Sequence, residues 1–149
     1  MFDGFSGTGI IQFNSYLKEG NIMDMYNVAL WIGTVKSEAD FYEYTEFRFN
    51  EDAPDDDEYD GYECKFAKDF KIDLDDIDED FMEVNYIDHI AKAKELLEDC
   101  SYYDGFIDQI PCDLEGNCFV LIFDYKYRKK VKNKNGIAFI GNFEFEDYV

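Results

Sequence analysis

The residue types in this chain that could do chemistry are one histidine, four cysteines and many carboxylates. A serine- or cysteine-based hydrolysis that needs an imidazole base would have to use His89, because it is the only histidine. It lies in residues 87–99, which have the apolar spacing of a helix, and a lone helical histidine is most often a surface or boundary residue. The sequence therefore predicts no catalytic residue and favours a protein that is not an enzyme.

Metal binding is weakly indicated. Cys112 and Cys118 lie six residues apart without a second pair, and no C-x-x-C or H-x-x-x-H spacing occurs. Residues 56–61 match the start of a calcium-binding loop, but the last loop position falls on Ala67, where a bidentate glutamate is needed. Paired carboxylates carry little information in a chain with 35 acidic residues. We therefore expect no metal and no cofactor.

Charge and composition narrow the class of partner. The 149 residues carry 35 acidic and 14 basic side chains, for a net charge of −21, and 46% of them are hydrophobic. A chain of this length and apolar content can bury a core, which argues for one folded domain and against disorder. Direct binding to nucleic acid is disfavoured because a phosphate backbone requires a basic footprint. A basic protein is the partner that this field would attract.

The N-terminal residues, the apolar runs and the cysteines indicate the cellular compartment in which we expect the protein. Residues 1–11 have no basic start and no long apolar run, so we expect no signal peptide. No segment approaches the roughly 20 apolar residues that a membrane span needs. The four cysteines are irregularly spaced, and a chain of this size does not need disulfides. These features predict a cytoplasmic protein with free thiols and no membrane contact, which we expect to be a monomer or a weak dimer.

The hydrophobic pattern predicts a mixed α+β domain, with three to four helices on a mixed or antiparallel sheet. Residues 1–25, with two Gly-rich turns, are interpreted as an extension that precedes or packs on a domain formed by residues 26–149. The continuous apolar run 28–32 suits a strand covered on both faces. Ser37, with Asp40 three residues later, is expected to cap a helix. Further helices are expected at 62–70, 87–99 and 102–110, and strands at 47–49 and 82–86.

The last third of the chain predicts a C-terminal β-hairpin. Residues 119–123 form an apolar run that continues as alternation to Tyr127, and a second run occupies 137–145. Asn135 and Gly136 lie between them and tolerate the positive φ of a two-residue type I′ turn. We expect one long antiparallel hairpin, with a basic tip. The tip carries Lys126, Arg128, Lys129, Lys130, Lys132 and Lys134.

Two acidic runs are the candidate binding surface. Seven of ten residues are acidic in 51–60, and six of eight in 73–80. Such runs are often only solvated faces, but they can also imitate the phosphates of nucleic acid and occupy a basic cleft. Tyrosines embedded in acidic sequence could anchor an interface: Tyr59 and Tyr62 flank Asp60, and Tyr102 and Tyr103 precede Asp104. The residues predicted to contact a partner are Asp55, Asp56, Asp57, Glu58, Tyr59, Asp60, Tyr62, Glu63, Asp75, Asp76, Asp78 and Glu79.

In the order of its motifs, the chain resembles the immunity protein 22 family of bacterial polymorphic-toxin systems. The resemblance extends over about residues 26–145. No single motif is specific, and the signal lies in their order. The motifs are Trp31-Ile32-Gly33, Ser37, Phe41, F-A-K-D-F at 66–70, D-F-M-E at 80–83, Ser101-Tyr102 with Phe106, and F-I-G-N-F at 139–143.

The resemblance implies a small cytoplasmic antidote that binds and neutralises a cognate toxin, and it supplies no catalytic residue. The acidic runs favour a nuclease as that toxin, because a nuclease has a cationic substrate groove. Residues 1–25 lie outside it. The main alternative from another class is an acidic nucleic-acid mimic or regulator that binds a basic host protein. An acid–base hydrolase is a third reading, and it would require a deep pocket that holds two carboxylates.

Overall fold

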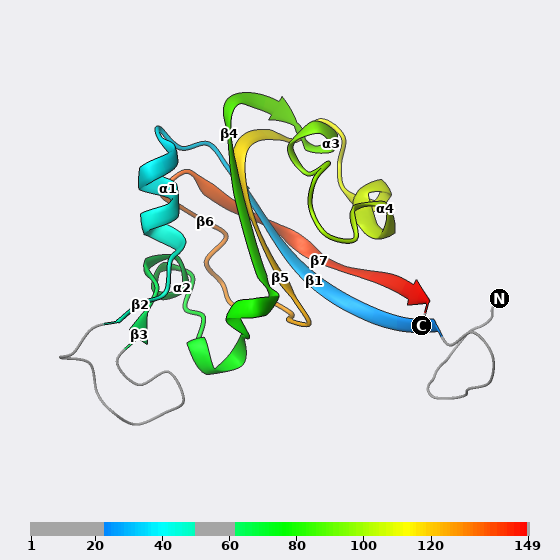
Figure 1. Ribbon diagram of the computed structural model, residues 1–149, viewed down its shortest axis with the longest axis horizontal. Helices are drawn as coiled ribbons and strands as arrows, with labels where there is room; N and C mark the ends of the chain where they lie inside the picture. The colour runs from blue at the N-terminus through cyan, green and yellow to red at the C-terminus, as the bar shows by residue number, and fades with distance from the viewer. Residues whose placement is uncertain (1–22, 50–61, 149) are drawn as a thin grey trace. The chain divides into compact units, whose positions relative to one another are not determined.

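A computed structural model describes residues 23–49 and 62–148 of the chain, with the side chains of 26–49 and 62–145 (Figure 1). Residues 27–144 form one compact unit, and the strand ends beyond it belong to a second, in which the ring of Tyr26 stacks on Phe145 at 5.5 Å. The proposed boundary between residues 25 and 26 stays a prediction. The α-helices are α1 (Glu38–Thr45), α2 (Lys65–Asp69), α3 (Ala93–Leu96) and α4 (Tyr103–Phe106), and the 3₁₀ turns are η1 (Leu74–Asp76), η2 (Glu79–Phe81) and η3 (Ile107–Gln109).

The strands form one five-stranded antiparallel sheet and one small hairpin, which confirms the predicted α+β class. The sheet order is β4-β5-β1-β7-β6, and β2 pairs with β3 separately. Strand β5 lies between two antiparallel neighbours, with Leu121 opposite Leu30 of β1 and Val120 opposite Val84 of β4. The strands are β1 (Met23–Gly33), β2 (Arg48–Phe49), β3 (Tyr62–Glu63), β4 (Met82–Lys92), β5 (Glu115–Phe123), β6 (Asn133–Lys134) and β7 (Ile137–Tyr148).

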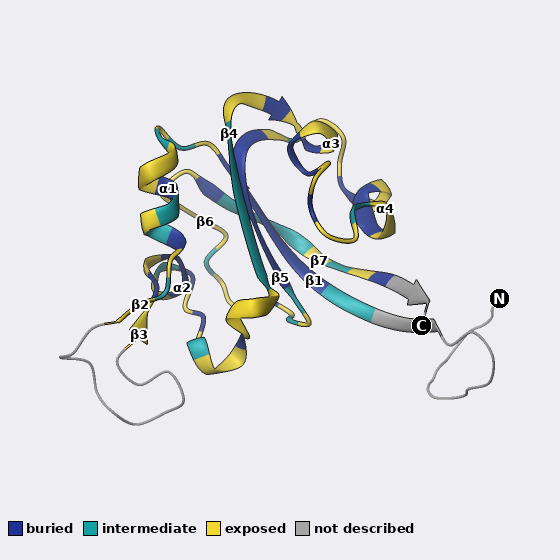
Figure 2. Ribbon diagram, in the orientation of Figure 1, coloured by how far each residue is buried: buried dark blue, intermediate teal, exposed yellow. Residues whose placement is uncertain are grey.

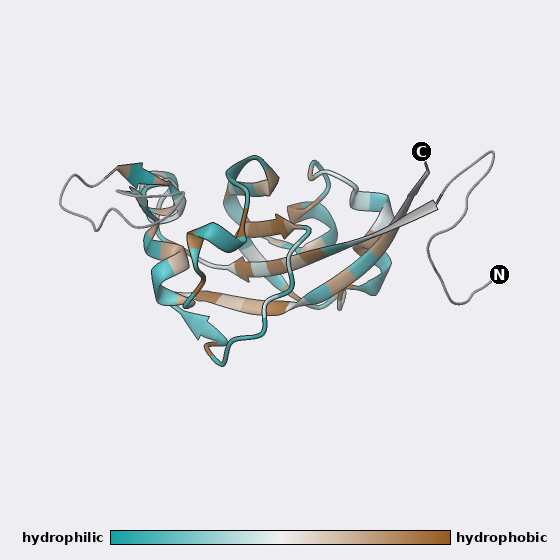
Figure 3. Cartoon of the chain, turned by 90° about the horizontal axis from the view of Figure 1, so that it is seen from below, coloured by the Kyte–Doolittle hydropathy of each residue, from teal (hydrophilic) through white to brown (hydrophobic). Residues whose placement is uncertain are grey.

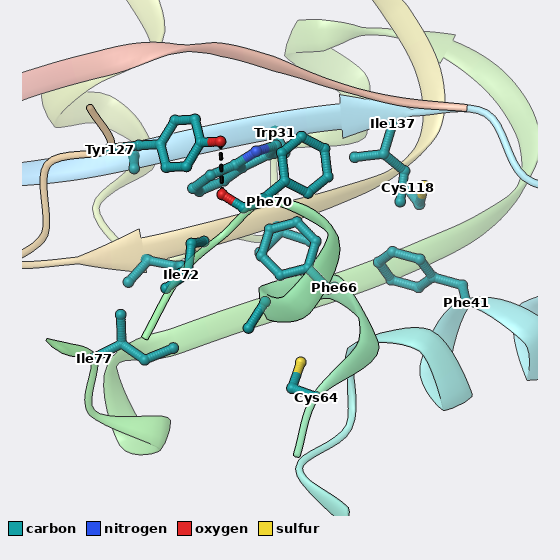
Figure 4. Close-up of a cluster of buried hydrophobic side chains, with 14 residues drawn as sticks. Trp31, Phe41, Cys64, Phe66, Phe70, Ile72, Ile77, Cys118, Tyr127 and Ile137 are labelled. Atoms are coloured by element: carbon teal, nitrogen blue, oxygen red, sulfur yellow. Dashed lines mark hydrogen bonds between the residues drawn. The ribbon is translucent and has the colours of Figure 1, made fainter. Parts of the chain in front are cut away.

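Both faces of the central strands are covered, as the apolar run 28–32 predicts (Figure 2). On one face, Trp31 has no exposed surface and its ring lies 5.0 Å from that of Phe66 on α2 and 5.1 Å from that of Tyr127 (Figure 4). The opposite face is packed by α3, and Tyr102 beside α4 contacts the ring of Phe123. Apolar residues are concentrated on the long strands of the sheet, while hydrophilic ones dominate the loops (Figure 3). A sheet buried on both faces explains how so acidic a chain retains a core.

Several local structures form where the sequence predicts them. Ser37 caps α1, its hydroxyl accepting the N–H of Asp40 at 3.1 Å. The predicted strand at 47–49 is β2, and the predicted helix at 102–110 is α4 followed by η3, which ends before Pro111. Of the predicted helix at 62–70, only 65–69 is helical, because Tyr62 and Glu63 pair with β2 as β3.

The predicted helix at 87–99 is wrong. Strand β4 continues to Lys92, and only Ala93–Leu96 is helical. The pairing of β4 with β5 is interrupted between Tyr86 and Ala91 and then resumes opposite Gly116. Such a register shift takes the side chains out of strict alternation, so the apolar pattern of the segment does not indicate a strand. His89 consequently lies on a strand and not on a helix.

The predicted long hairpin is also wrong in its partners, although its turn is correct. Asn135 and Gly136 have φ values of 55° and 80°, as a type I′ turn requires, but they join β7 only to the two-residue strand β6. Strand β1 lies between β5 and β7. Strand β5 ends at Phe123, and Asp124 takes a left-handed φ of 60°, so that Tyr127 enters the core instead of continuing the strand.

Candidate partner-binding surface

The acidic segment 73–80 is held in two consecutive 3₁₀ turns. The carboxylate of Asp73 accepts the N–H of Asp75 at 3.0 Å, and that of Asp78 accepts the N–H of Asp80 at 2.9 Å. Ile77, between the turns, is buried in the core. This pattern of apolar anchors and capping carboxylates leaves the other acids in solvent. The predicted contact residues in this segment, Asp75, Asp76, Asp78 and Glu79, are all exposed.

The small β2–β3 hairpin presents an aromatic pair. Tyr62 is 46% exposed, and its ring lies edge-on to that of Phe49 at 5.5 Å, with Phe49 itself 58% exposed. Exposed rings of this size are typical of interface anchors. Tyr62 and its exposed neighbour Glu63 were predicted as contact residues. Phe49 was not, because its alternation with neighbouring residues indicated a strand and not an exposed pair.

The remaining predicted contact residues lie outside the described part of the chain, and their assignment stays a prediction. They are Asp55, Asp56, Asp57, Glu58, Tyr59 and Asp60.

An open groove of about 600 Å³ adjoins these two features. It lies between α1, β2 and β4, and Tyr42, Phe47, Met82 and Val84 contribute its apolar lining. Glu79 is the predicted contact residue that lines it, and Glu43 and Glu46 of α1 supply two further carboxylates. The sequence could not identify this groove, because α1 and β4 are distant in the chain. The hydroxyl of Tyr42 lies 3.4 Å from the side-chain oxygen of Asn85.

The groove is acidic despite two ion pairs at its rim. Glu46 pairs with Arg48 at 2.6 Å, and Glu43 pairs with Lys65 at 2.9 Å. The hydrogen bond from Lys65 lowers the pKa of Glu43, so this carboxylate stays ionised. Both pairs are solvent-exposed and contribute little to stability. Three carboxylates around an apolar floor suit a partner that presents cationic and aliphatic or aromatic groups.

Tyr102 and Tyr103 do not join this surface. The ring of Tyr102 packs 5.8 Å from that of Phe123, and the hydroxyl of Tyr103 donates to the backbone oxygen of Lys94 at 3.1 Å. Phe123 and its neighbour Ile122 point to opposite faces of the sheet, and Ile122 belongs to the Trp31 cluster. The two tyrosines therefore lie on the face opposite α1 and the groove.

Catalytic and metal-binding arrangements gain no support within residues 23–49 and 62–148. No group of three or more histidine, cysteine or acidic side chains in these ranges is arranged to hold a metal ion. His89 is exposed, and its two ring nitrogens face the carboxylates of Asp88 and Glu95. All four cysteines are free thiols. In the described ranges, no helix has both the length and the apolar content needed to cross a membrane.

Comparison with known families assigns the chain to one of them. The sequence model of one family, described as Immunity protein 22, matches residues 28–146, which extend from β1 to the far end of β7. The chain belongs to the immunity protein 22 family. No curated protein and no solved structure matches it. Membership of the immunity protein 22 family confirms the expected resemblance and supports a role in immunity that involves a toxin partner.

Proposed function

We propose that this protein is a cytoplasmic immunity protein that neutralises one cognate bacterial toxin by stoichiometric binding and without catalysis. The family match over residues 28–146 is the observation that carries the proposal. The toxin-facing surface comprises the acidic turns 73–80, the groove between α1 and β4, and the β2–β3 hairpin. Here and below this surface is called the acidic surface.

The proposed toxin is basic, and a nuclease fits this description. A nuclease binds its substrate in a cationic cleft, so carboxylates arranged on a rigid scaffold can occupy that cleft in place of phosphates. A net charge of −21 accelerates the encounter with such a protein, particularly at low salt. Affinity then requires anchors, which Tyr62, Phe49 and the apolar floor of the groove provide.

The direct test is rescue from toxicity. The chain is co-expressed with the C-terminal domain encoded by the gene immediately upstream, and cell survival is scored with and without it. Survival together with a stable one-to-one complex on size-exclusion chromatography supports the proposal. If the domain is toxic and this chain neither rescues the cells nor binds it, the proposal fails for that pair, and a basic host protein becomes the better candidate partner.

A matched pair of variants tests the acidic surface. Glu79 lines the groove, whereas Glu98 follows α3; both side chains are exposed, and replacing either by Lys alters the net charge by the same amount. We expect Glu79→Lys to slow association by about tenfold more than Glu98→Lys at low salt. Equal association rates for the two variants would show that the toxin binds elsewhere. Tyr62→Ala should instead raise the dissociation rate, because removing the ring should weaken the binding free energy by about 1 to 2 kcal/mol.

A further inference from the structure

A second charged surface of opposite sign is built from two segments far apart in the sequence. The hydroxyl of Tyr127 donates to the backbone oxygen of Phe70 at 2.8 Å, and the side-chain amide of Asn135 donates to the carboxylate of Asp69 at 2.8 Å. These contacts hold residues 126–135 against the end of α2. The exposed cations that they gather, here called the basic surface, are Lys68, Lys71, Arg128, Lys129, Lys130 and Lys134.

The backbone of this surface is fixed by specific contacts. The side chain of Asn142 brackets the peptide of Tyr127, accepting its N–H at 2.9 Å and donating to its carbonyl at 3.0 Å. The ammonium of Lys132 lies 5.2 Å from the centre of the Phe139 ring and donates to the carbonyl of Lys129. A surface whose backbone is already ordered loses little conformational entropy on binding.

Within the described residues, none of these cations has an ion-pair partner. Among the described residues, no carboxylate lies within ion-pair distance of Arg128, Lys129, Lys130 or Lys134, whereas the neighbouring Lys126 faces Glu144 at 3.9 Å. Residues 126–134 hold six of the 14 basic side chains in a protein whose net charge is −21. Placing so much positive charge in one ordered segment suits a partner that presents anions.

The chemistry of the surface favours protein carboxylates over nucleic acid. Tyr127 is only 2% exposed, and the large exposed apolar side chains of the described residues all fall outside residues 65–71 and 126–135, so neither segment offers a platform on which bases could stack. A long polyanion would also be repelled by the rest of this acidic chain. Carboxylates confined to a patch on a basic protein meet neither objection, and the guanidinium of Arg128 can bind one in bidentate geometry.

One partner can contact the basic surface and the acidic surface at the same time. Helix α1 stands between them, because its Tyr42 and Glu46 line the groove while the hydroxyl of Tyr44 donates to Asp69 at 2.7 Å, beside the basic surface. A helix is only about 10 Å across, and a standard interface covers about 800 Å² of each partner.

We propose that the basic surface binds a carboxylate-rich segment of the same toxin whose basic face meets the acidic surface. The inference rests on the proposed function and adds a second, opposite charge requirement. A toxin would then be recognised by the arrangement of both signs of charge, so that a basic protein without the acidic segment would bind weakly.

A charge-matched comparison tests the inference. Lys130→Glu in the basic surface and Lys94→Glu on α3 both take the net charge from −21 to −23, since each replaces one positive charge with one negative charge. Both lysines are exposed and neither has an ion pair among the described residues. The net charge alone would make both variants bind a basic toxin slightly faster. The inference instead requires the two variants to differ.

The measurement is the Kd for the purified C-terminal domain encoded upstream, at about 50 mM salt, where surface charges act over more than 10 Å. We expect the Kd of Lys130→Glu to exceed that of Lys94→Glu by about tenfold, and Arg128→Glu to behave like Lys130→Glu. Equal Kd values, with the unaltered chain binding tightly, would overturn the inference and leave the proposed function intact. Failure of the unaltered chain to bind would overturn both.

A DNA-binding assay tests the alternative that the basic surface binds nucleic acid. Fluorescence anisotropy with labelled single-stranded and double-stranded DNA 20-mers is measured on the unaltered chain, Lys130→Glu and Lys94→Glu. We expect no binding that depends on Lys130. Binding to DNA that Lys130→Glu abolishes, with unchanged affinity for the toxin domain, would contradict the inference and assign the basic surface to nucleic acid.

Discussion

Tyr127 and Phe70, 57 residues apart in the sequence, are joined by a buried hydrogen bond from the tyrosine hydroxyl to the phenylalanine carbonyl. Phe70 follows α2, where its carbonyl has no partner within the helix, and Tyr127 follows β5. The same hydroxyl lies 2.9 Å from the carbonyl of Val131. One side chain therefore holds α2 and residues 126–131 together around Trp31.

Removing this hydroxyl should destabilise the fold. Tyr127→Phe keeps the ring contacts with Trp31 and Phe139 but leaves the carbonyl of Phe70 buried without its donor, at a cost of about 1 to 2 kcal/mol. Urea unfolding monitored by the fluorescence of the only tryptophan measures the change. Tyr125→Phe is the control, since the Tyr125 side chain is half-buried and no hydrogen bond is seen for its hydroxyl within the described residues. Equal losses for the two variants would contradict the assigned role of Tyr127.

The turn at Asn135-Gly136 should tolerate no side chain at Gly136. The residue has a φ of 80°, and an added Cβ would lie 2.6 Å from the backbone oxygen of Thr34. Gly136→Ala should therefore cost about 1 to 3 kcal/mol of folding free energy.

Thermal or urea unfolding of Gly136→Ala is compared with that of Gly141→Ala. At Gly141 the nearest atom to an added Cβ is the end of the Phe143 ring, at 3.2 Å, which can shift. The smaller loss is expected for Gly141→Ala. A destabilisation of Gly136→Ala no greater than that of Gly141→Ala would show that Thr34 can move away.

The same turn shows which features could be predicted from the sequence. The Asn-Gly pair, the Ser37 cap and the apolar run 28–32 are local signals, and each formed the predicted structure. The partners of β1 could not be predicted, because they depend on contacts between residues far apart. Gly33 illustrates this, since an added Cβ there would lie 2.6 Å from Ile137, so the close approach of β7 depends on a glycine more than a hundred residues away.

In the candidate site, too, local features could be predicted from the sequence, and features that depend on distant contacts could not. Charge and hydrophobic anchors in residues 73–80 predicted exposed acids, and the structure places them in solvent. The groove could not be predicted, because β4 reaches α1 only after pairing with β5, and Glu43 and Glu46 have no distinguishing pattern in the sequence. The helical spacing of 87–99 gave a wrong prediction because the register of β4 shifts between Tyr86 and Ala91, so the segment lacks the strict alternation that would have indicated a strand.

Thiol reactivity should separate Cys112 from the other cysteines. Burial raises the pKa of Cys100 and of Cys118 to about 12, and it also raises the pKa of Cys64, so all three remain protonated and inaccessible at pH 8. Cys112 is exposed. We expect a thiol reagent such as 5,5′-dithiobis(2-nitrobenzoate) to modify one cysteine in the native protein and four in denaturant.

Cys112→Ser should then be almost unreactive until it unfolds. Rapid native modification of more than one thiol would contradict the burial of the other three. The same assay on the toxin complex is informative, since Cys112 does not line the groove between α1 and β4 and should remain reactive when the acidic surface is covered.

The single histidine should give the protein a pH-dependent contribution to stability. His89 Nδ1 lies 3.1 Å from a carboxylate oxygen of Asp88, and Nε2 lies 2.7 Å from one of Glu95. The hydrogen bonds to Asp88 and then Glu95 raise the pKa of His89 above its ordinary value of about 6.5. The folded state therefore binds the proton more tightly than the unfolded chain does. The stabilisation is present in full below about pH 6.5 and is lost as the pH rises through the folded pKa.

NMR titration of the imidazole nitrogens measures the pKa of His89 directly, because no other histidine contributes a signal. The value should lie above 6.5 and fall in Glu95→Gln, which removes the charge facing Nε2. In urea unfolding, the stability difference between the unaltered protein and His89→Gln should shrink as the pH rises through that value. A His89 pKa at or below 6.5 would show that solvent replaces both contacts, in which case the bulge of β4 is not held to α3 through Glu95.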